Sequence, residues 1–402
     1  MESRFDICVV GGGMSGMTAA LALARAGFEV ALVERVPRQT ILDSSFDGRV
    51  SSVSWGSKLV LERLDAWRDI APRAQPILDI RVSDRQSPFF LHYDHRDVGD
   101  HPMGWIMENR VLRQALDSAV GRAARVHPVC AGVVAMECDD AGATLGLDDG
   151  ARLRCSLVVA CDGARSPLRA MAGIDAWQHD YRQTAIIATV RHSRPHNGIA
   201  HERFLAGGPF AILPLPGDRS SIVWTEDEEI ARRVLEIDHG SFSEELAWRF
   251  GDFLGPLEVT GPVLDHHLSL VVANRLTGWR LALVGDAAHA IHPIAGQGFN
   301  LGIRDAAVLA EVLADMARLG LDPGTGAALA AYARRRRVDT WMLVAMTHGL
   351  NRLFAMRSPP VALARGLGLA LVGSMKPVKR QLMKDAMGVA GRLPRLMTGE
   401  RL

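Results

Sequence analysis

Apolar residues in the first 35 positions follow two periods, which together predict a strand, a helix and a second strand. Residues 5–10 (FDICVV) form a short, mostly apolar run that is typical of a buried strand. A helical pattern follows over residues 17–27 (MTAALALARAG), and residues 28–34 (FEVALVE) again have the character of a strand. The pattern therefore predicts a β-loop-α-β unit with a glycine-rich loop, GGGMSG, after its first strand.

This loop has the spacing of a dinucleotide-binding site. Its members are, in order, Gly11, Gly13, Met14, Ser15 and Gly16. The first glycine permits a tight turn, the second lets the backbone approach a pyrophosphate at the helix N-terminus, and the third lets the helix pack closely on the strand. Glu34 ends the second strand, where it can bind a ribose diol and disfavours the 2′-phosphate of NADP. The loop alone leaves NAD and FAD open.

Two distant segments also place an acidic, glycine-containing loop after a strand. Residues 157–173 (LVVACDGARSPLRAMAG) contain Asp162 in an Asp-Gly pair, and residues 283–313 contain Asp286 in a Gly-Asp pair. Ligands of open α/β sheets gather at the carboxyl ends of the strands, so three loops point at one extended ligand. FAD is long enough to need all three. Asp286 would bind hydroxyls of its ribityl chain, the alternative being a helix cap.

The middle of the chain predicts a second sheet. Residues 180–192 and 210–226 have the pattern of short strands, the latter forming a hairpin around residues 216–218. We expect an α/β fold, in part α+β, with a Rossmann-like FAD-binding domain, an interleaved mixed β-sheet substrate domain and a C-terminal helical segment. The expected boundaries are 1–75, 103–176 and 271–335 for the FAD domain, 76–102 and 177–270 for the substrate domain, and 336–402 for the basic helical segment.

Composition and charge restrict location and partners. The 402 residues carry a net charge of +1, and we expect no nucleic-acid partner. The chain has no apolar stretch of about 20 residues and no signal-peptide pattern, and its five cysteines form no CxxC pair. A cytoplasmic protein is therefore expected. No metal is expected either, because His289 and His292 lack further ligands at suitable spacing.

Three motifs together resemble those of the p-hydroxybenzoate-hydroxylase-like FAD monooxygenases: GGGMSG, CDGARSPLR and GDAAHAIHPIAGQGFNLGIRDA. Four further stretches are similar to the ubiquinone-biosynthesis hydroxylases of that class. They are GWIMENRVLRQAL, the Tyr181-x-Gln183 pair, GGPFAILPLP and MKPVKRQLMKDAMG. The resemblance covers nearly the whole chain. One departure is FDGRVSSVS, which keeps Asp47 and Arg49 of the family pattern but differs in the residues that follow.

The resemblance implies a set of site residues. Glu34 and Arg35 would contact the adenosine end of FAD, and Asp162 with Gly163 would contact both FAD and a transient nicotinamide. Residues near the pyrophosphate or the flavin ring would be Arg49, Asn109, Arg110 and Arg113. The loop and helix start at the flavin would contribute Pro293, Gly296, Gln297, Gly298, Phe299 and Asn300, of which Pro293, Gly296 and Gln297 lie nearest the chemistry. A substrate-pocket wall would consist of Phe210, Ile212, Pro214 and Trp224, the alternative being ordinary core packing.

The resemblance also implies the reaction. NAD(P)H would bind briefly and transfer a hydride to FAD, O2 would form a flavin C4a-hydroperoxide, and a polyprenylated phenol of ubiquinone biosynthesis would be hydroxylated. No catalytic base can be assigned. The alternatives are another flavin enzyme of this fold, such as a halogenase or a prenyl reductase, and a non-enzymatic prenyl-binding chaperone. The absence of a Trp-x-Trp-x-Ile-Pro signature counts against a halogenase, and the intact acidic loops count against a chaperone.

The C-terminal segment suggests how a water-insoluble substrate is reached. Residues 340–402 hold ten Lys and Arg against two acidic residues, beside an apolar stretch at residues 361–373. Basic charge beside an apolar face is what an interfacial segment needs. We expect this segment to dock on the inner face of the membrane or on partner proteins of ubiquinone biosynthesis. The alternative is that its helices cap the flavin domain and expose a solvated basic face.

Overall fold

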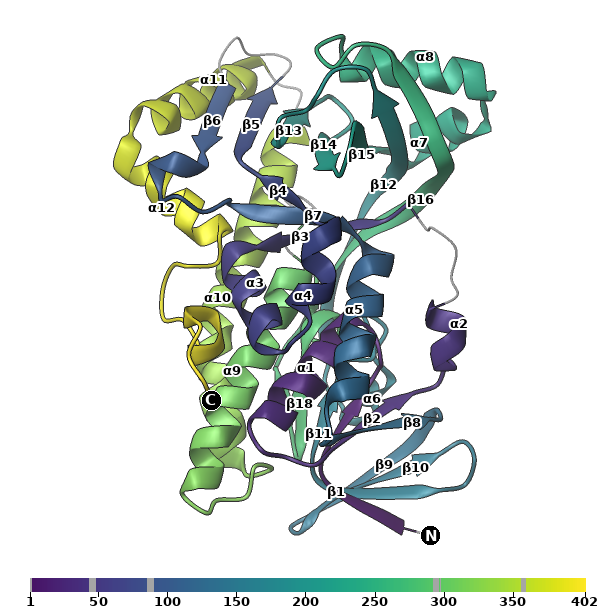
Figure 1. Cartoon of the computed structure of the whole chain (residues 1–402), viewed down its shortest axis with the longest axis vertical. Helices are drawn as coiled ribbons and strands as arrows, with labels where there is room; N and C mark the ends of the chain where they lie inside the picture. The colour runs from purple at the N-terminus through teal and green to yellow at the C-terminus, as the bar shows by residue number, and fades with distance from the viewer. Residues whose placement is uncertain (1, 43–47, 85–89, 292–295, 297, 356–358) are drawn as a thin grey trace.

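A parallel sheet forms the lower half of the molecule in Figure 1, with the strand order β18-β11-β1-β2-β8. The computed structural model describes residues 2–42, 48–84, 90–291, 296, 298–355 and 359–402. Strand β17 pairs antiparallel with β18, and the hairpin β9–β10 extends from β11. The strands are β1 (Glu2–Val10), β2 (Val30–Glu34), β8 (Val126–Cys130), β9 (Val133–Asp139), β10 (Gly142–Leu147), β11 (Arg152–Ala160), β17 (Thr277–Gly278) and β18 (Leu281–Leu283).

Helices pack against this sheet and form the main core with it. They are α1 (Met14–Arg25), α5 (Asn109–Arg122), α6 (Pro167–Met171), α9 (Gly298–Arg318) and α10 (Gly326–Ala355). The sequence predicted the first helix from residue 17, but α1 begins three residues earlier, because part of the glycine loop already has helical geometry. This shift puts Gly13 at the N-cap of α1, in an extended conformation.

A second, mixed sheet lies in the upper half, with the order β19-β16-β12-β15-β14-β13-β5-β6. The predicted hairpin around residues 216–218 is confirmed, since β14 pairs antiparallel with β15 across it. The strands are β5 (Asp79–Asp84), β6 (Phe90–Asp94), β12 (Ala176–His192), β13 (Ile199–Phe204), β14 (Pro209–Leu215), β15 (Arg219–Asp227), β16 (Leu257–Ala273) and β19 (His289–Ala290). One face packs on α7 (Glu228–Glu236) and α8 (His239–Phe250).

Shorter elements connect the halves and complete the chain. A three-stranded sheet of β3 (Val50–Ser54), β7 (Gly104–Glu108) and β4 (Gln75–Ile77) lies between the two larger sheets. The remaining elements are α2 (Arg38–Leu42), α3 (Trp55–Arg63), α4 (Trp67–Ile70), η1 (Ala71–Arg73), η2 (His95–Asp97), η3 (Gly285–Ala287), α11 (Pro359–Ser374), α12 (Lys376–Ala386) and η5 (Arg395–Thr398). Figure 1 shows α10 rising from the lower half to the second sheet and α11 lying beside β5 and β6. The expected fold class is confirmed.

A buried charge network fixes α9 and α10 to the loop that follows β18. Asp305 of α9 is fully buried and accepts hydrogen bonds from Arg336 Nε of α10 (2.6 Å), from His289 Nε2 (2.7 Å) and from the Gly285 amide (3.0 Å). Burial alone would raise the pKa of Asp305, but His289 and Arg336 outweigh it and hold that pKa below its usual range. The carboxylate therefore stays charged and positions the loop that carries Asp286.

We predict that Arg336→Met destabilises the protein strongly. The substitution keeps the side-chain volume but leaves Asp305 as a buried charge without its cation, which costs about 3–5 kcal/mol. Urea denaturation measures the loss. Arg318→Met is the matched control, because Arg318 pairs with Asp315 at the exposed end of α9, where an ion pair contributes about 0–1 kcal/mol. Equal losses in both variants would contradict the assigned role of the network.

Candidate functional site

Three loops meet at one edge of the parallel sheet, as the sequence predicted. The backbone amides that open two of these loops donate to carbonyls at or next to the ends of neighbouring strands. Gly11 donates to Val33 and Cys161 to Val10, each at a distance of 2.8 Å. Val284, one residue before the third loop, donates to Ala160 over 3.0 Å. Strands β1, β11 and β18 are direct neighbours in this order, so segments about 150 and 280 residues along the chain converge on the glycine loop.

The three glycines of the first loop have different roles. A Cβ atom on Gly11, whose φ is +104°, would lie 2.4 Å from the Cys161 carbonyl oxygen, and one on Gly16 would lie 1.7 Å from the Gly11 oxygen. These two positions are closed by the protein itself. A Cβ on Gly13 would meet no atom within 4 Å. The open space at Gly13 lies at the N-terminus of α1, where unpaired N–H groups favour a pyrophosphate.

A pocket lies beside the glycine loop, in the region where the resemblance places the adenosine end of FAD. Its lining includes Glu34, Arg38, Arg113, Asp117 and Cys130. The Glu34 carboxylate accepts a hydrogen bond from the Gly12 backbone amide at a distance of 2.6 Å, so the glycine loop itself fixes its position. Arg38 donates to Asp117 at a distance of 2.6 Å and lines this pocket. Arg35 is exposed, as Arg38 is, and does not belong to the lining residues. Arg38 lies in a short helix whose approach to α5 no local pattern predicts.

The two acidic loops offer carboxylates and open backbone. Asp162 accepts the Leu168 amide through Oδ2 over 3.1 Å, while its buried Oδ1 has no hydrogen-bond donor among the described residues. Burial raises the pKa of Asp162, and bonds from Ser166 and Leu168 oppose the shift. The side chain of Asp286 is accessible to solvent, but protein surrounds it on most sides. The resulting desolvation raises the pKa of Asp286, while the nearby His289 and His266 act to lower it. Both carboxylates gain from hydroxyl donors of a ligand.

Arg169 joins the two acidic loops. Its guanidinium donates to the Ala287 carbonyl over 2.9 Å and to the Ala164 carbonyl over 2.8 Å, and the side chain is buried. Sequence reasoning noted this residue only as part of a motif and gave it no role. A buried guanidinium that binds two carbonyls fixes the spacing between the loops.

The start of α9 is tied to the small middle sheet. Asn300 accepts the Ser54 amide over 2.9 Å and donates to the Ser52 carbonyl over 2.8 Å, so its amide is used by the protein. Gly296 has a φ of +61°, and a Cβ on it would lie 3.0 Å from Ser52. Gly298 is the first residue of the 21-residue helix α9, and a Cβ added to it would meet no atom within 4 Å. The next residue, Phe299, packs on the main core. Pro293, Gln297, His292 and Asp47 lie outside the described residues.

The expected arginine and asparagine cluster is partly assembled. The Asn109 amide donates to the Arg49 carbonyl over 2.9 Å, and the Asn109 side chain accepts from Ser51 over 2.6 Å. The start of α5 therefore lies beside the strand that carries Arg49. Arg110 instead pairs with Glu108 over 2.6 Å, a contact within its own segment. Arg113 lines the pocket beside the glycine loop.

The expected substrate wall lies on the opposite face of the second sheet, which is a correction. Phe210, Ile212 and Trp224 are buried against α7 and α8. Pro214 comes two residues after Ile212 in β14 and therefore lies on the same face of the sheet. The other face points toward the three loops: His266 lies near Arg49 and Asp286, and an added Cβ on Gly48 would touch Leu264. Alternating apolar residues predicted a buried face but could not say which face meets the site.

The loop-facing side of this sheet carries a carboxyl group that the sequence did not single out. Glu202 of β13 lies opposite Ala211 and Val82, on the face that also carries Ala200 and Phe204. It is partly accessible but surrounded by protein, and burial raises the pKa of Glu202 to about 7. In the part of the chain that the structure describes, no cluster of three His, Cys, Asp or Glu side chains could hold a metal ion.

Comparison with known proteins agrees with this geometry. Residues 4–347 match the family model described as FAD binding domain. The ubiquinone hydroxylase UbiL of Rhodospirillum rubrum is 46% identical over 98% of this chain and 92% of its own length. The 3-demethoxyubiquinol 3-hydroxylase of Escherichia coli is 32% identical over 96% of this chain and 98% of its own. The p-nitrophenol 4-monooxygenase PnpA of Pseudomonas putida DLL-E4 shares the fold, with a TM-score of 0.80 at 22% identity, over 98% of this chain and 100% of its own.

The fold, the open glycine positions and the family match define the class of protein: a flavoprotein that binds FAD and acts as an aromatic-ring monooxygenase. Within that class, the chain belongs to the ubiquinone-hydroxylase family. The site residues fit FAD, because Gly13 and Gly163 leave open space and Asp162 keeps a free buried acceptor. These matches favour the hydroxylase over the halogenase, the reductase and the chaperone.

We predict that Gly13→Val and Gly16→Val fail in different ways. Valine at position 13 meets only open space, so the free energy of unfolding of the cofactor-free protein, measured with urea, should change by no more than about 1 kcal/mol, the usual cost of a poor N-cap. It should nevertheless be purified without flavin absorbance, because the side chain fills the space of the pyrophosphate. Valine at position 16 collides with backbone and should disrupt the fold itself. A Gly13→Val protein that retains a full complement of FAD would refute the pyrophosphate assignment.

Proposed function

We propose that the protein hydroxylates the aromatic ring of a polyprenylated phenol in ubiquinone biosynthesis, using FAD, NAD(P)H and O2. The observation that carries this proposal is the convergence of three strand-end loops on one edge, facing a second sheet. The relatives named as ubiquinone and demethoxyubiquinol hydroxylases support the pathway. When bound, the flavin supplies hydride acceptance and the activation of O2.

The residues proposed to hold FAD follow from their places in the site. The backbone at Gly13 receives the pyrophosphate, Glu34 receives the adenosine ribose, and Asp286 binds the ribityl chain. The N-terminus of α9 faces the pyrimidine side of the flavin, where its dipole favours negative charge. The supporting contacts come from Gly11, Met14, Ser15, Gly16, Arg49, Asn109, Arg113, Asp162, Gly163, Gly296, Gly298, Phe299 and Asn300.

The two halves of the molecule are proposed to divide the work. The parallel sheet binds FAD, and the second sheet, with residues 76–102 and 177–270, forms the roof of the substrate site. The sequence has one dinucleotide fingerprint, so NAD(P)H binds transiently near Asp162 rather than on a domain of its own. Among the described residues we assign no general base. The protein positions the ring and keeps water away from the reacting atoms.

A labelling experiment tests this function. The purified yellow protein, given NAD(P)H, isotopically labelled O2 and a short-chain prenylated phenol, should form a product with one labelled oxygen on the ring. The Gly13→Val variant and an anaerobic sample are the controls and should form none. NAD(P)H oxidation that releases only hydrogen peroxide, or a product without added oxygen, would contradict the proposed reaction with this class of substrate.

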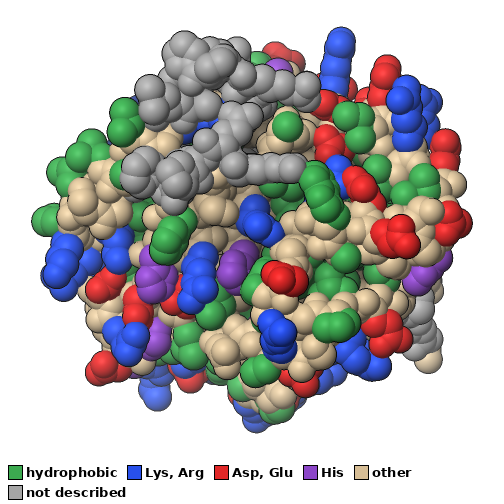
Figure 2. All heavy atoms as spheres, turned by 90° about the horizontal axis from the view of Figure 1, so that it is seen from above, with side chains coloured by type: hydrophobic (Ala, Val, Ile, Leu, Met, Phe, Trp, Pro, Cys, Tyr) green, Lys and Arg blue, Asp and Glu red, His purple; other side chains and the backbone are tan. Residues whose placement is uncertain are grey.

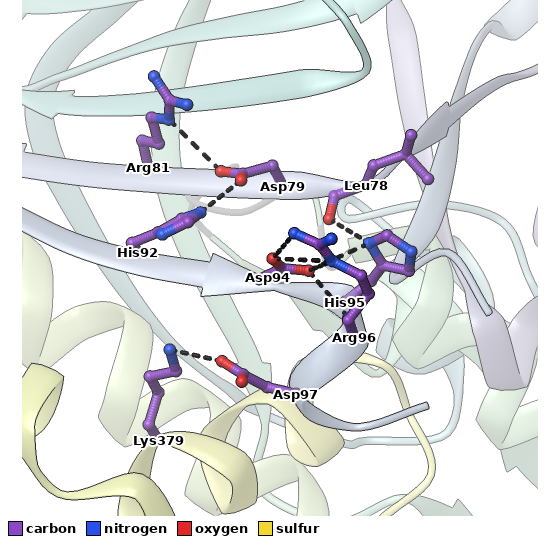
Figure 3. A network of polar contacts seen from close by, with 9 residues as sticks. All are labelled: Leu78, Asp79, Arg81, His92, Asp94, His95, Arg96, Asp97 and Lys379. Carbon is purple, nitrogen blue, oxygen red and sulfur yellow. Dashed lines mark hydrogen bonds and ion pairs between the residues drawn. The ribbon is translucent and has the colours of Figure 1, made fainter. Parts of the chain in front are cut away.

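We further propose that α12 docks the protein on an anionic membrane surface. Lys376, Arg380 and Lys384 are all exposed and recur every four residues, which places them on one side of the helix. Lys379 instead pairs with Asp97 over 2.6 Å and fastens α12 beside the charged residues of β5 and β6 (Figure 3). No helix within the described residues is long and apolar enough to cross a membrane.

Exposed apolar side chains on α10 and α11 are proposed to enter the headgroup region beside this stripe. Trp341 and Met342 of α10 are 49% and 62% exposed, and Leu367 and Leu371 of α11 are also exposed. The face seen from above in Figure 2 mixes apolar, basic and acidic side chains and shows no field of one sign. The proposed contact therefore rests on the basic stripe of α12.

The triple variant Lys376→Gln, Arg380→Gln, Lys384→Gln should lose most of its co-sedimentation with anionic vesicles. Each basic residue near such a surface contributes about 1 kcal/mol. Flavin content should stay unchanged, because none of the three is proposed to bind FAD. A control triple variant of the exposed residues Arg25, Arg232 and Arg233, with the same change of charge, should bind like the parent protein. Equal loss in both variants, or no vesicle binding by the parent at low salt, would overturn the docking proposal.

A further inference from the structure

Helix α10 is hydrogen-bonded to an irregular point of the second sheet. The register of β12 against β16 shifts between Asp180 and Gln183, and Arg182 at this bulge has a φ of +52°. Beyond the bulge, Gln183 Oε1 accepts a hydrogen bond from Asn351 Nδ2 of α10 over 3.0 Å. Gln183 Nε2 in turn donates to the Gly207 carbonyl over 2.9 Å. The two amides and the carbonyl form a chain that runs from the helix into the sheet.

The orientation of this chain is fixed by its inner end. A backbone carbonyl can only accept, so the Gln183 amide must turn its NH2 group toward Gly207 and its oxygen toward Asn351. That oxygen can only accept, so Asn351 must present its own NH2 group to Gln183. The Asn351 oxygen, Oδ1, is therefore left at the outer end of the chain as a hydrogen-bond acceptor.

This acceptor is buried and unsatisfied. Asn351 is 4% exposed and Gln183 5%, and Asn351 Oδ1 has no donor among the residues that the structure describes. Leaving a buried polar atom without a partner costs about 1–3 kcal/mol, so such atoms in native proteins call for a physical reason. A carbonyl oxygen at this place needs a neutral hydroxyl or N–H group, and it repels a carboxylate or a phenolate.

The amide chain lies on the side of the sheet that faces the flavin site. Gln183 and Ala185 share that face, since they are two residues apart along β12. Ala185 lies opposite His266, which is close to Arg49 and Asp286. One turn beyond Asn351 on α10, Phe354 stacks on Phe204 of β13 with ring centroids 3.6 Å apart. An aromatic pair therefore lies on the helix turn that follows the acceptor.

We propose that Asn351 Oδ1 accepts the hydrogen bond of the ring hydroxyl of the phenolic substrate and so selects a free, neutral phenol. This inference rests on the proposed function. Gln183 acts as a positioning residue, because it holds the Asn351 amide in the orientation that leaves Oδ1 unpaired and turned away from Gln183. The alternative is that a water molecule occupies the position and the amide pair serves only to attach α10 to the sheet.

Binding measurements separate these two roles. The probes are a phenol with one prenyl unit and the same molecule without its hydroxyl group, titrated into the flavin-loaded protein without NAD(P)H and followed by the flavin absorbance. The parent protein should bind the phenol about tenfold more tightly than the deoxy compound, the effect of one neutral hydrogen bond in a buried site. Asn351→Leu should bind both compounds equally and should bind the deoxy compound as the parent does.

Two further variants keep the test decisive. Gln183→Leu should also reduce the preference for the phenol, because the Asn351 amide is then no longer held in one orientation. If Asn351→Leu is purified without flavin, Gln183→Leu takes its place in the test. His348→Phe removes a neighbouring contact of α10, the 3.1 Å approach of His348 Nδ1 to the Tyr181 hydroxyl, and should keep the tenfold preference. A full preference in Asn351→Leu, or in Gln183→Leu where that variant replaces it, would overturn the inference.

The result can be read independently of the proposed function. If the parent protein binds the phenol and hydroxylates it while both amide variants keep its preference, the function stands and Asn351 has only a structural role. If the parent binds neither compound and adds no oxygen to the phenol, the proposed function itself fails. A parent protein that binds both compounds equally tightly would overturn the role of Asn351 directly, whatever the reaction.

Discussion

The parallel pairing of β1 with β11 and of β11 with β18 is the constraint on which the site depends. Parallel strands align their carboxyl ends, so the loops after the three strands must emerge at one edge. The glycine loop can pack this tightly because Gly11 and Gly16 leave no room for a side chain. Gly13 and Gly163 remain open at this edge, since a Cβ added to either would meet no atom within 4 Å.

Buried charges hold this edge in position from behind. Asp305 accepts hydrogen bonds from Arg336, His289 and the Gly285 amide. Arg169 donates hydrogen bonds to carbonyls of both acidic loops. A buried carboxylate is costly unless it is paired and hydrogen-bonded, and here each of its oxygens has a partner. The same residues that neutralise Asp305 also join α9, α10 and the loop of Asp286. The position of α10, and with it that of Asn351, is therefore coupled to the cofactor edge.

The two faces of the second sheet pack against different parts of the molecule. The face with Phe210, Ile212 and Trp224 is closed by α7 and α8. The other face, with Gln183 and His266, meets the loops and the far end of α10. A hydroxylase for a prenylated ring needs an apolar roof with few polar groups, since each polar group must be matched by the substrate. The Asn351 acceptor fits that requirement.

The sequence by itself determined the nucleotide loop, the acid at the end of β2, the two acidic strand ends and the hairpin of the second sheet. These features are local, because glycine spacing and apolar periodicity act within a few residues. Tertiary structure alone decided which sheet face meets the site, that Arg38 lines the pocket beside the glycine loop, and that Arg169, Asp305 and Arg336 support the loops. Those outcomes depend on which elements pack together, and a buried acceptor such as Asn351 Oδ1 becomes visible only when partners from β12, α10 and the Gly207 turn are in place.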